Sequence, residues 1–182
     1  MTDSDPPSPS PAGEHVVFAA DEQDAHPVDV DRWARLAEHA LRSEGTTDGE
    51  LSLLFVDEAA MADLNRRFMG ADGPTDVLAF PIDEHDVTSG RDPDHGTAGP
   101  GRPPAEPDDL PALLGDVVIC PAVAARNAPD HAGTYDDELA LLVVHGVLHV
   151  LGHDHAEPDE RDRMQDRERH ILATFADEGR SR

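Results

Sequence analysis

Four short segments of the chain concentrate hydrophobic residues, and each predicts a β-strand. Valine, leucine, isoleucine and phenylalanine dominate these segments, and strands favour β-branched and aromatic side chains. The fourth segment is a continuous apolar run. The four predicted strands are residues 15–20, residues 50–56, Asp76 to Phe80, and Gly115 to Cys120.

Apolar residues at helical spacing predict helices between and after these strands. The first runs from Asp29 to Ser43, and Asp29 or Asp31 can cap its start. A second, after residue 56, would turn one apolar face inward, and a short helix is predicted from Pro121 to Asn127. The last amphipathic helix runs from Pro158 to Phe175. The inward residues are Met61, Leu64 and Phe68 in the second helix, and Met164, Ile171 and Leu172 in the last.

The order of these elements, β-α-β-α-β-loop-β-α-α-α, predicts one α/β domain. We expect a small four-stranded mixed sheet packed with about five helices over residues 15–176. Residues 1–14 are rich in proline, serine and aspartate and predict a disordered tail. Residues 82–112 form an acidic insert that we expect to be mobile, and residues 177–182 a frayed end.

One helix stands out because it is apolar on nearly every side from Leu139 to Val150. A helix of this kind is buried. Thr134 can cap its start, with Asp137 in the reciprocal position of a capping box. Two histidines interrupt the apolar run, so the prediction places them on a central, rigid helix, which suits a metal site.

The charge and the single cysteine narrow the class of protein. The chain has 39 acidic and 14 basic residues, a formal net charge of −25, and all of the basic residues are arginine. This acidity argues against tight non-specific binding of nucleic acid, although a local arginine-lined groove remains compatible with it. Cys120 is alone, so no intramolecular disulfide forms, and we expect it in the core. We find no membrane span or signal peptide and expect a soluble cytoplasmic protein.

The stretch from residue 145 to residue 155 carries four histidines and an aspartate. His145 and His149 are four apart and therefore share one helix face. His155 follows ten residues after His145, and Gly152 lets the helix end and the chain turn back. Three protein ligands with a fourth position open for water are typical of catalytic zinc. His153 is the alternative third ligand, but it follows Gly152 directly, so we favour His155 and expect His153 to be exposed.

The residues around these histidines indicate the reaction. Asp154 and Asp116 are candidates to orient a ligand through its second ring nitrogen. Gly146 stands where zinc peptidases carry the glutamate that acts as general base. Its absence disfavours peptide hydrolysis and favours attack of a metal-activated water on a phosphodiester. Asp154 and the metal-bound hydroxide itself are the candidate proton acceptors.

Three stretches of the sequence resemble the YbeY family of bacterial endoribonucleases. The first is His-Gly-x-Leu-His-x-x-Gly-x-Asp-His at residues 145–155, with a Glu-Leu-x-x-Leu lead-in at residues 138–142. The second is Leu-Asn at residues 64–65, followed by Pro-Thr-Asp-Val-Leu-x-Phe-Pro at residues 74–81. The third is Gly-Asp before an apolar strand at residues 115–116. The resemblance covers about residues 15–175.

The resemblance implies a zinc-dependent endoribonuclease that prefers single strands. Its expected role is maturation of the 3′ end of the small-subunit (16S) ribosomal RNA and ribosome quality control. The implied partners are ribosomal RNA and the small ribosomal subunit, with no membrane and no nucleotide cofactor. By similarity the zinc ligands, one ion per chain, are His145, His149 and His155.

The sequence departs from the family at one position. Many members carry an arginine in the loop after the Leu-Asn helix, and the aligned residue here is Met69. Either Arg66 or Arg67 reaches the site and helps catalysis, or this chain lacks that cation. We expect a locally basic cleft with Arg66, Arg67 or Arg126 near the metal.

Two other functions remain open from the sequence. One is a peptidase-like zinc hydrolase, against which Gly146 counts. The other is a ribosome-assembly factor with a mainly structural metal. A structural zinc usually has four protein ligands. A fourth ligand, His153 or Asp154, would favour that alternative.

Overall fold

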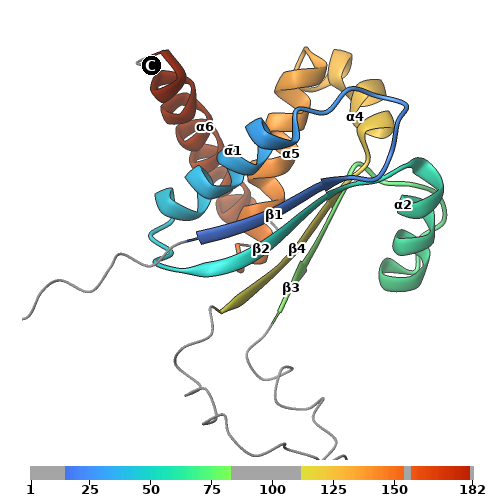
Figure 1. Cartoon of the computed structure of the whole chain (residues 1–182), viewed down its shortest axis with the longest axis horizontal. Coiled ribbons are helices and arrows are strands. Elements are labelled where there is room, and N and C mark those ends of the chain that lie inside the picture. Colours follow the sequence, from blue (N-terminus) through green and yellow to red (C-terminus); the bar gives the residue numbers. More distant parts are fainter. Residues whose placement is uncertain (1–14, 83–111, 154–156, 181–182) are drawn as a thin grey trace, which may run out of the picture.

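The structure is a computed structural model that describes residues 15–82, 112–153 and 157–180. Its sheet has four strands in the order β1-β2-β4-β3 (Figure 1). β1, β2 and β4 run parallel, and β3 is antiparallel to β4. The predicted four-stranded mixed sheet is therefore confirmed. The strands are β1 (His15–Asp21), β2 (Gly49–Phe55), β3 (Val77–Pro81) and β4 (Leu113–Ile119).

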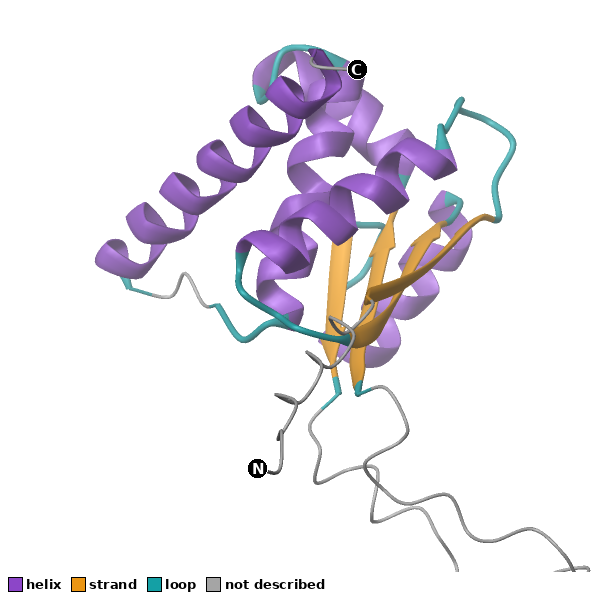
Figure 2. Cartoon of the chain, turned by 60° about the vertical axis from the view of Figure 1, so that its left-hand side comes forward, coloured by secondary structure: helices purple, strands orange, loops and turns teal. Residues whose placement is uncertain are grey.

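Helices lie on both sides of this sheet (Figure 2). Helices α1, α5 and α6 share one hydrophobic core with β2 and β4, whereas α2 and α4 contribute to a smaller core. The five helices of the described residues confirm the predicted number and order. They are α1 (Val30–Ser43), α2 (Glu58–Leu64), α4 (Pro121–Asn127), α5 (Tyr135–Val150) and α6 (Pro158–Arg180). The described residues also contain two short turns: the π-helical turn η1 (Asn65–Met69) and the 3-10 turn η3 (Ala128–Asp130).

Helix α5 is the centre of the larger core, as its apolar sequence predicts. It contacts β3, β4, α1 and α6, and Leu139, Val143 and Leu148 are fully buried. Full burial of one such side chain contributes about 1.5–3 kcal/mol to folding. Surrounded in this way, α5 holds its two histidines rigidly.

The predicted caps are present. The Asp29 side chain accepts a hydrogen bond from Arg32 N at the start of α1. Thr134 Oγ1 accepts one from Asp137 N at the start of α5, and it donates to the Asp137 carboxylate. These bonds satisfy backbone donors that a helix start leaves without an intrahelical partner.

Three expectations about chain segments meet different outcomes. Helix α6 continues to Arg180, so residues 177–180, expected to be frayed, are helical. The expected disordered tail and nearly all of the expected mobile insert lie outside the described residues.

Cys120 is buried as expected, and this burial raises the pKa of its thiol. None of the described helices is long and apolar enough to cross a membrane.

The prediction that Phe68 faces inward is wrong, because Phe68 is 57% exposed. The reason is local: α2 ends at Leu64 and the chain continues as the π-helical turn η1. A π-helical turn takes up more residues than an α-helical turn, so the inward face moves along the sequence. Gly70 then ends the turn with a left-handed φ of 68°, donating its N–H to Asn65 O.

Candidate metal centre

Helix α5 places the imidazoles of His145 and His149 side by side. Their Nε2 atoms lie 3.1 Å apart, and their ring centroids are 4.6 Å apart in an edge-to-face arrangement. The spacing of four residues puts both rings on one helix face, as predicted. Two ring nitrogens this close can share one proton or point their lone pairs at one cation.

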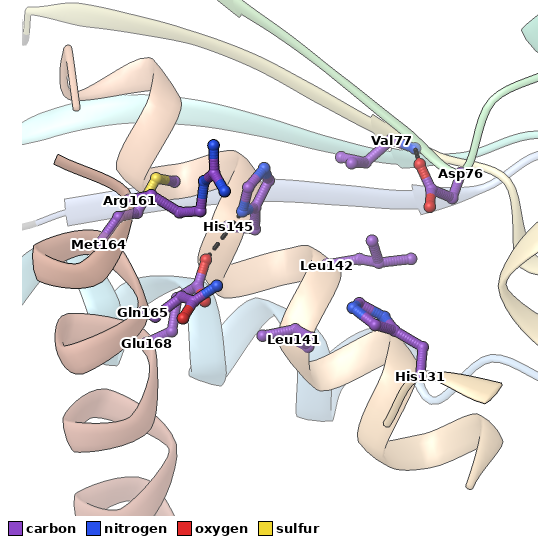
Figure 3. Close-up of a pocket in the computed structure, with 10 residues that line it drawn as sticks. All are labelled: Asp76, Val77, His131, Leu141, Leu142, His145, Arg161, Met164, Gln165 and Glu168. Carbon is purple, nitrogen blue, oxygen red and sulfur yellow. Dashed lines mark hydrogen bonds and ion pairs between the residues drawn. The ribbon is translucent and has the colours of Figure 1, made fainter. Parts of the chain in front are cut away.

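Behind His145 lies a buried carboxylate that is not among the residues predicted from the sequence. Glu168 of α6 is 7% exposed, and its Oε1 lies 2.8 Å from His145 Nδ1 (Figure 3). An ionised carboxylate only accepts hydrogen bonds, so this contact favours the proton on Nδ1 and leaves the Nε2 lone pair toward His149. A signal was present in the sequence: Glu168 lies at helical spacing between the inward residues Met164 and Ile171.

Asp116, one of the two candidates to orient a ligand, lies on β4 opposite Phe80 of β3. It is half-buried and does not line either cavity beside His145. Glu168, and not Asp116, is the carboxylate that contacts His145 Nδ1. The role expected of Asp116 stays a prediction.

Gly146 lets α5 approach β4 closely. A Cβ atom at this position would lie 2.5 Å from Val117 Cγ1, a distance that real side chains do not tolerate. Val117 is fully buried, so it has little room to move. The position that carries the general base in zinc peptidases therefore accepts a side chain here only if Val117 or the helix shifts.

Two cavities flank His145. The first, of about 240 Å³, lies between α5 and α6 (Figure 3). The second, of about 390 Å³, lies between α5 and β3. The first is lined by Asp76, Val77, His131, Leu141, Leu142, His145, Arg161, Met164, Gln165 and Glu168. The second is lined by Met69, Asp76, Val77, Leu78, Ala79, Pro81, His145, Gly146 and His149.

Asp76 lines both cavities and was not singled out from the sequence. Its Oδ1 accepts a hydrogen bond from Val77 N at 2.8 Å, and its Oδ2 accepts one from Asn127 Nδ2 at 3.2 Å. These contacts hold the carboxylate at the start of β3. The site therefore presents an acidic group on the rim shared by the two cavities.

The three arginines that were expected near the metal form ion pairs outside the two cavities. Arg66 and Arg67 both contact the Asp63 carboxylate, and Arg126 pairs with Glu58 at 2.6 Å. None of these three arginines lines either cavity, whereas Arg161 of α6 lines the first. Met69, at the aligned position of the family arginine, does line the second cavity. The catalytic roles of Arg66 and Arg67 stay predictions.

His153 is half-buried, so the expectation that it is exposed is wrong. Its Nε2 lies 3.0 Å from Glu44 Oε2, and Arg167 contacts the same carboxylate oxygen at 2.7 Å. This contact with the end of α1 draws His153 into a separate cluster. Asp154 and His155 lie outside the described residues, and within the described ranges no three His, Cys, Asp or Glu side chains form a complete metal site.

Together, these features define a class: a small α/β protein with a pair of adjacent histidines on its central helix. Comparison with known proteins gives the family. The model of the Endoribonuclease YbeY family matches residues 18–176. The chain therefore belongs to the YbeY family, which confirms the resemblance seen in the sequence and the assignment to the nucleases.

Two curated relatives support this membership. Endoribonuclease YbeY of Salinispora tropica is 50% identical over 149 residues, which cover 81% of this chain and 88% of the relative. Endoribonuclease YbeY of Beutenbergia cavernae is 47% identical over 152 residues, covering 82% and 91%. The fold resembles the solution structure of TM1509 from Thermotoga maritima, with a TM-score of 0.55, 23% identity, and coverage of 92% and 93%.

Proposed function

We propose that this protein is a zinc-dependent endoribonuclease that cuts single-stranded RNA. Its substrate is the 3′ end of the 16S ribosomal RNA, its partner is the small ribosomal subunit, and it acts in maturation and quality control of ribosomes. The observation that carries the proposal is the pair of Nε2 atoms of His145 and His149, 3.1 Å apart on a buried helix. The names of the curated relatives support the choice of RNA.

The residues present fit a zinc ion. Two ligands about 2.0–2.1 Å from one tetrahedral zinc lie about 3.3 Å from each other, close to the separation of these two nitrogens. Glu168 favours the tautomer in which His145 Nε2 carries the lone pair, as a ligand requires. His155 is the proposed third ligand, by resemblance to the family.

A bound zinc would lower the pKa of a water molecule and polarise the phosphodiester. The chain's own residues would position the substrate. Arg161, which lines the cavity with His145, is placed to hold a phosphate oxygen. Asp76 faces the same cavity and can accept a proton, in addition to Asp154. Gly146 contributes no acid or base.

The proposal is tested by cleavage of a labelled single-stranded ribosomal RNA fragment. We expect cleavage by the zinc-loaded protein, loss of cleavage after chelation, and recovery when zinc is restored. His149→Ala should lower the zinc content and abolish cleavage. Full zinc-dependent activity in this variant would contradict the site assignment.

His153→Ala is the matched control, because it removes a histidine four residues further on that contacts Glu44. We expect this variant to keep its zinc and its activity, whereas His155→Ala should lose both. The opposite result would make His153 the third ligand. A duplex of the same RNA should be cut more slowly than the single strand.

The two alternative functions make different predictions. Chelator-sensitive cleavage of a peptide and not of RNA would support a peptidase, although the contact expected at Val117 argues against the glutamate that such enzymes use. Tight zinc binding without RNA cleavage would support an assembly factor with a structural metal.

A further inference from the structure

Phe68 of the turn η1 is one of two phenylalanines in the described residues that are more than half exposed. In the described part of the chain, the exposed large hydrophobic residues are Phe18, Phe68, Met69 and Leu113. Two of them are consecutive, and they occupy the turn η1. Met69 lines the cavity that also contains His145 and His149, and Phe68, the preceding residue, packs on Phe80 of the smaller core.

The backbone holds Phe68 in a defined place. Asn65, only 8% exposed, donates from Nδ2 to Gly73 O at 2.8 Å and thereby ties η1 to the following loop. The Phe68 ring packs against Phe80 of β3, with centroids 5.0 Å apart and planes at 65°. Phe80 in turn packs on the smaller core. The exposed ring is therefore a fixed platform.

An arginine lies beside this platform in a strongly acidic chain. The Arg67 guanidinium carbon lies 5.5 Å from the centroid of the Phe68 ring. The side chains of Arg66 and Arg67 are 62% and 64% exposed, and both contact Asp63, which leaves a net charge of about +1 on the three groups. An exposed aromatic ring with a cation beside it is how proteins bind unpaired nucleotides, by stacking on the base and attracting the phosphate.

We propose that Phe68 is the stacking platform for an unpaired base of the RNA, on a nucleotide separated by Met69 from the phosphodiester held at the histidine pair. The inference rests on the proposed function and adds a substrate-binding residue to it. It also gives a reason for single-strand preference at this site, because a base inside a duplex is stacked on its neighbours and cannot cover the ring. Arg67, whose guanidinium lies over the Phe68 ring, would then pair with the phosphate of the stacked nucleotide.

The test uses the zinc-loaded full-length chain and a short fluorescein-labelled oligoadenylate, at low temperature, with a gel to show that the RNA stays intact. Fluorescence anisotropy gives the dissociation constant. Stacking of one base on an aromatic ring is typically worth about 5- to 150-fold in affinity. We expect Phe68→Ala and Phe68→Leu to weaken binding by at least about fivefold, whereas Phe68→Trp keeps it within about twofold.

Phe18→Ala is the matched control. Phe18 is 58% exposed, nearly the same as Phe68, but it lies on β1, at the opposite edge of the sheet from β3. Its loss should leave RNA affinity unchanged. An oligonucleotide with abasic sites, which keeps every phosphate, should bind wild type as weakly as Phe68→Ala binds the intact RNA, and Phe68→Ala should not distinguish the two.

Phe68→Trp also reports stacking directly. The only natural tryptophan, Trp33, is 2% exposed in the core, so an added indole at position 68 is the one that RNA can quench. We expect quenching by the intact oligonucleotide and none by the abasic one. Absence of quenching, or equal RNA affinity of Phe68→Ala and wild type, overturns the stacking proposal alone. Wild-type protein that neither binds nor cuts RNA overturns this inference together with the proposed function.

Discussion

The contact between Glu168 and His145 leads to a quantitative prediction for Glu168→Gln. The variant keeps the shape of the side chain but replaces a charged acceptor by a neutral amide. Hydrogen bonds to charged groups contribute about 1.5–3 kcal/mol, and neutral ones about 0.5–1.5 kcal/mol. The expected loss is therefore about 1–2 kcal/mol, because the carboxylate is 7% exposed and water screens it little.

If the weaker hydrogen bond destabilises only the zinc-bound protein, zinc affinity should fall about tenfold, since about 1.4 kcal/mol corresponds to one factor of ten. This agrees with the range of about 10–100-fold seen when the partner of a metal-bound histidine is changed. Competition with a colorimetric zinc chelator measures the affinity. Glu168→Ala, which removes the partner altogether, should approach the upper end of that range.

Glu178→Gln is the control on the same helix, because the Glu178 side chain is 59% exposed and lies near His39, away from the histidine pair. It should bind zinc as wild type does. Thermal melting of both zinc-free variants would show that each is folded. The reasoning about Glu168 is refuted if folded Glu168→Gln binds zinc as tightly as Glu178→Gln.

Three further predictions concern packing, pH and metal removal. Gly146→Ala should lower the free energy of unfolding in urea, because overpacking against Val117 costs about 1–3 kcal/mol and exceeds the gain in helix propensity of about 1 kcal/mol. Gly179→Ala, with nothing within 4 Å of the new Cβ, should show the gain alone, and equal effects would contradict the close approach. Burial and then neighbouring negative charges raise the pKa of Tyr135, the only tyrosine, to about 12. Because the unfolded chain loses this proton near pH 10, the free energy of unfolding should fall between pH 10 and 12, and an absorbance titration with a midpoint near 10 would refute this. Saturating zinc, at about 100 times its dissociation constant, should stabilise wild type by about 2.7 kcal/mol and His149→Ala much less, as chelator-dependent melting would show.

The fold follows from the sequence to a large extent because its signals are local. Each strand is a short apolar run, and α5 is apolar on nearly every side, so burial itself selects their places. The spacing of His145 and His149 similarly fixes their neighbourhood, since residues four apart on a helix always share a face. These features can be predicted without knowing which segments of the chain meet in the folded protein.

The wrong or missing predictions concern side chains whose environment depends on a change of helix type or on a contact with a residue far away in the sequence. Phe68 was placed inward by continuing the α-helical period through η1, which has a different period. His153 was expected to be exposed because its partner, Glu44, is 109 residues away in the sequence. Glu168 is not among the predicted site residues because a charged residue of an amphipathic helix ordinarily faces solvent, although this one follows the inward spacing of its helix.

The central claim is that the Nε2 atoms of His145 and His149 hold one metal ion. The most direct test is an anomalous difference map at the zinc absorption edge, recorded from crystals of the zinc-loaded protein. One peak is expected about 2.0–2.1 Å from both nitrogens. A map with no peak between these two imidazoles, or with its peak beside His153 and Glu44, would contradict it.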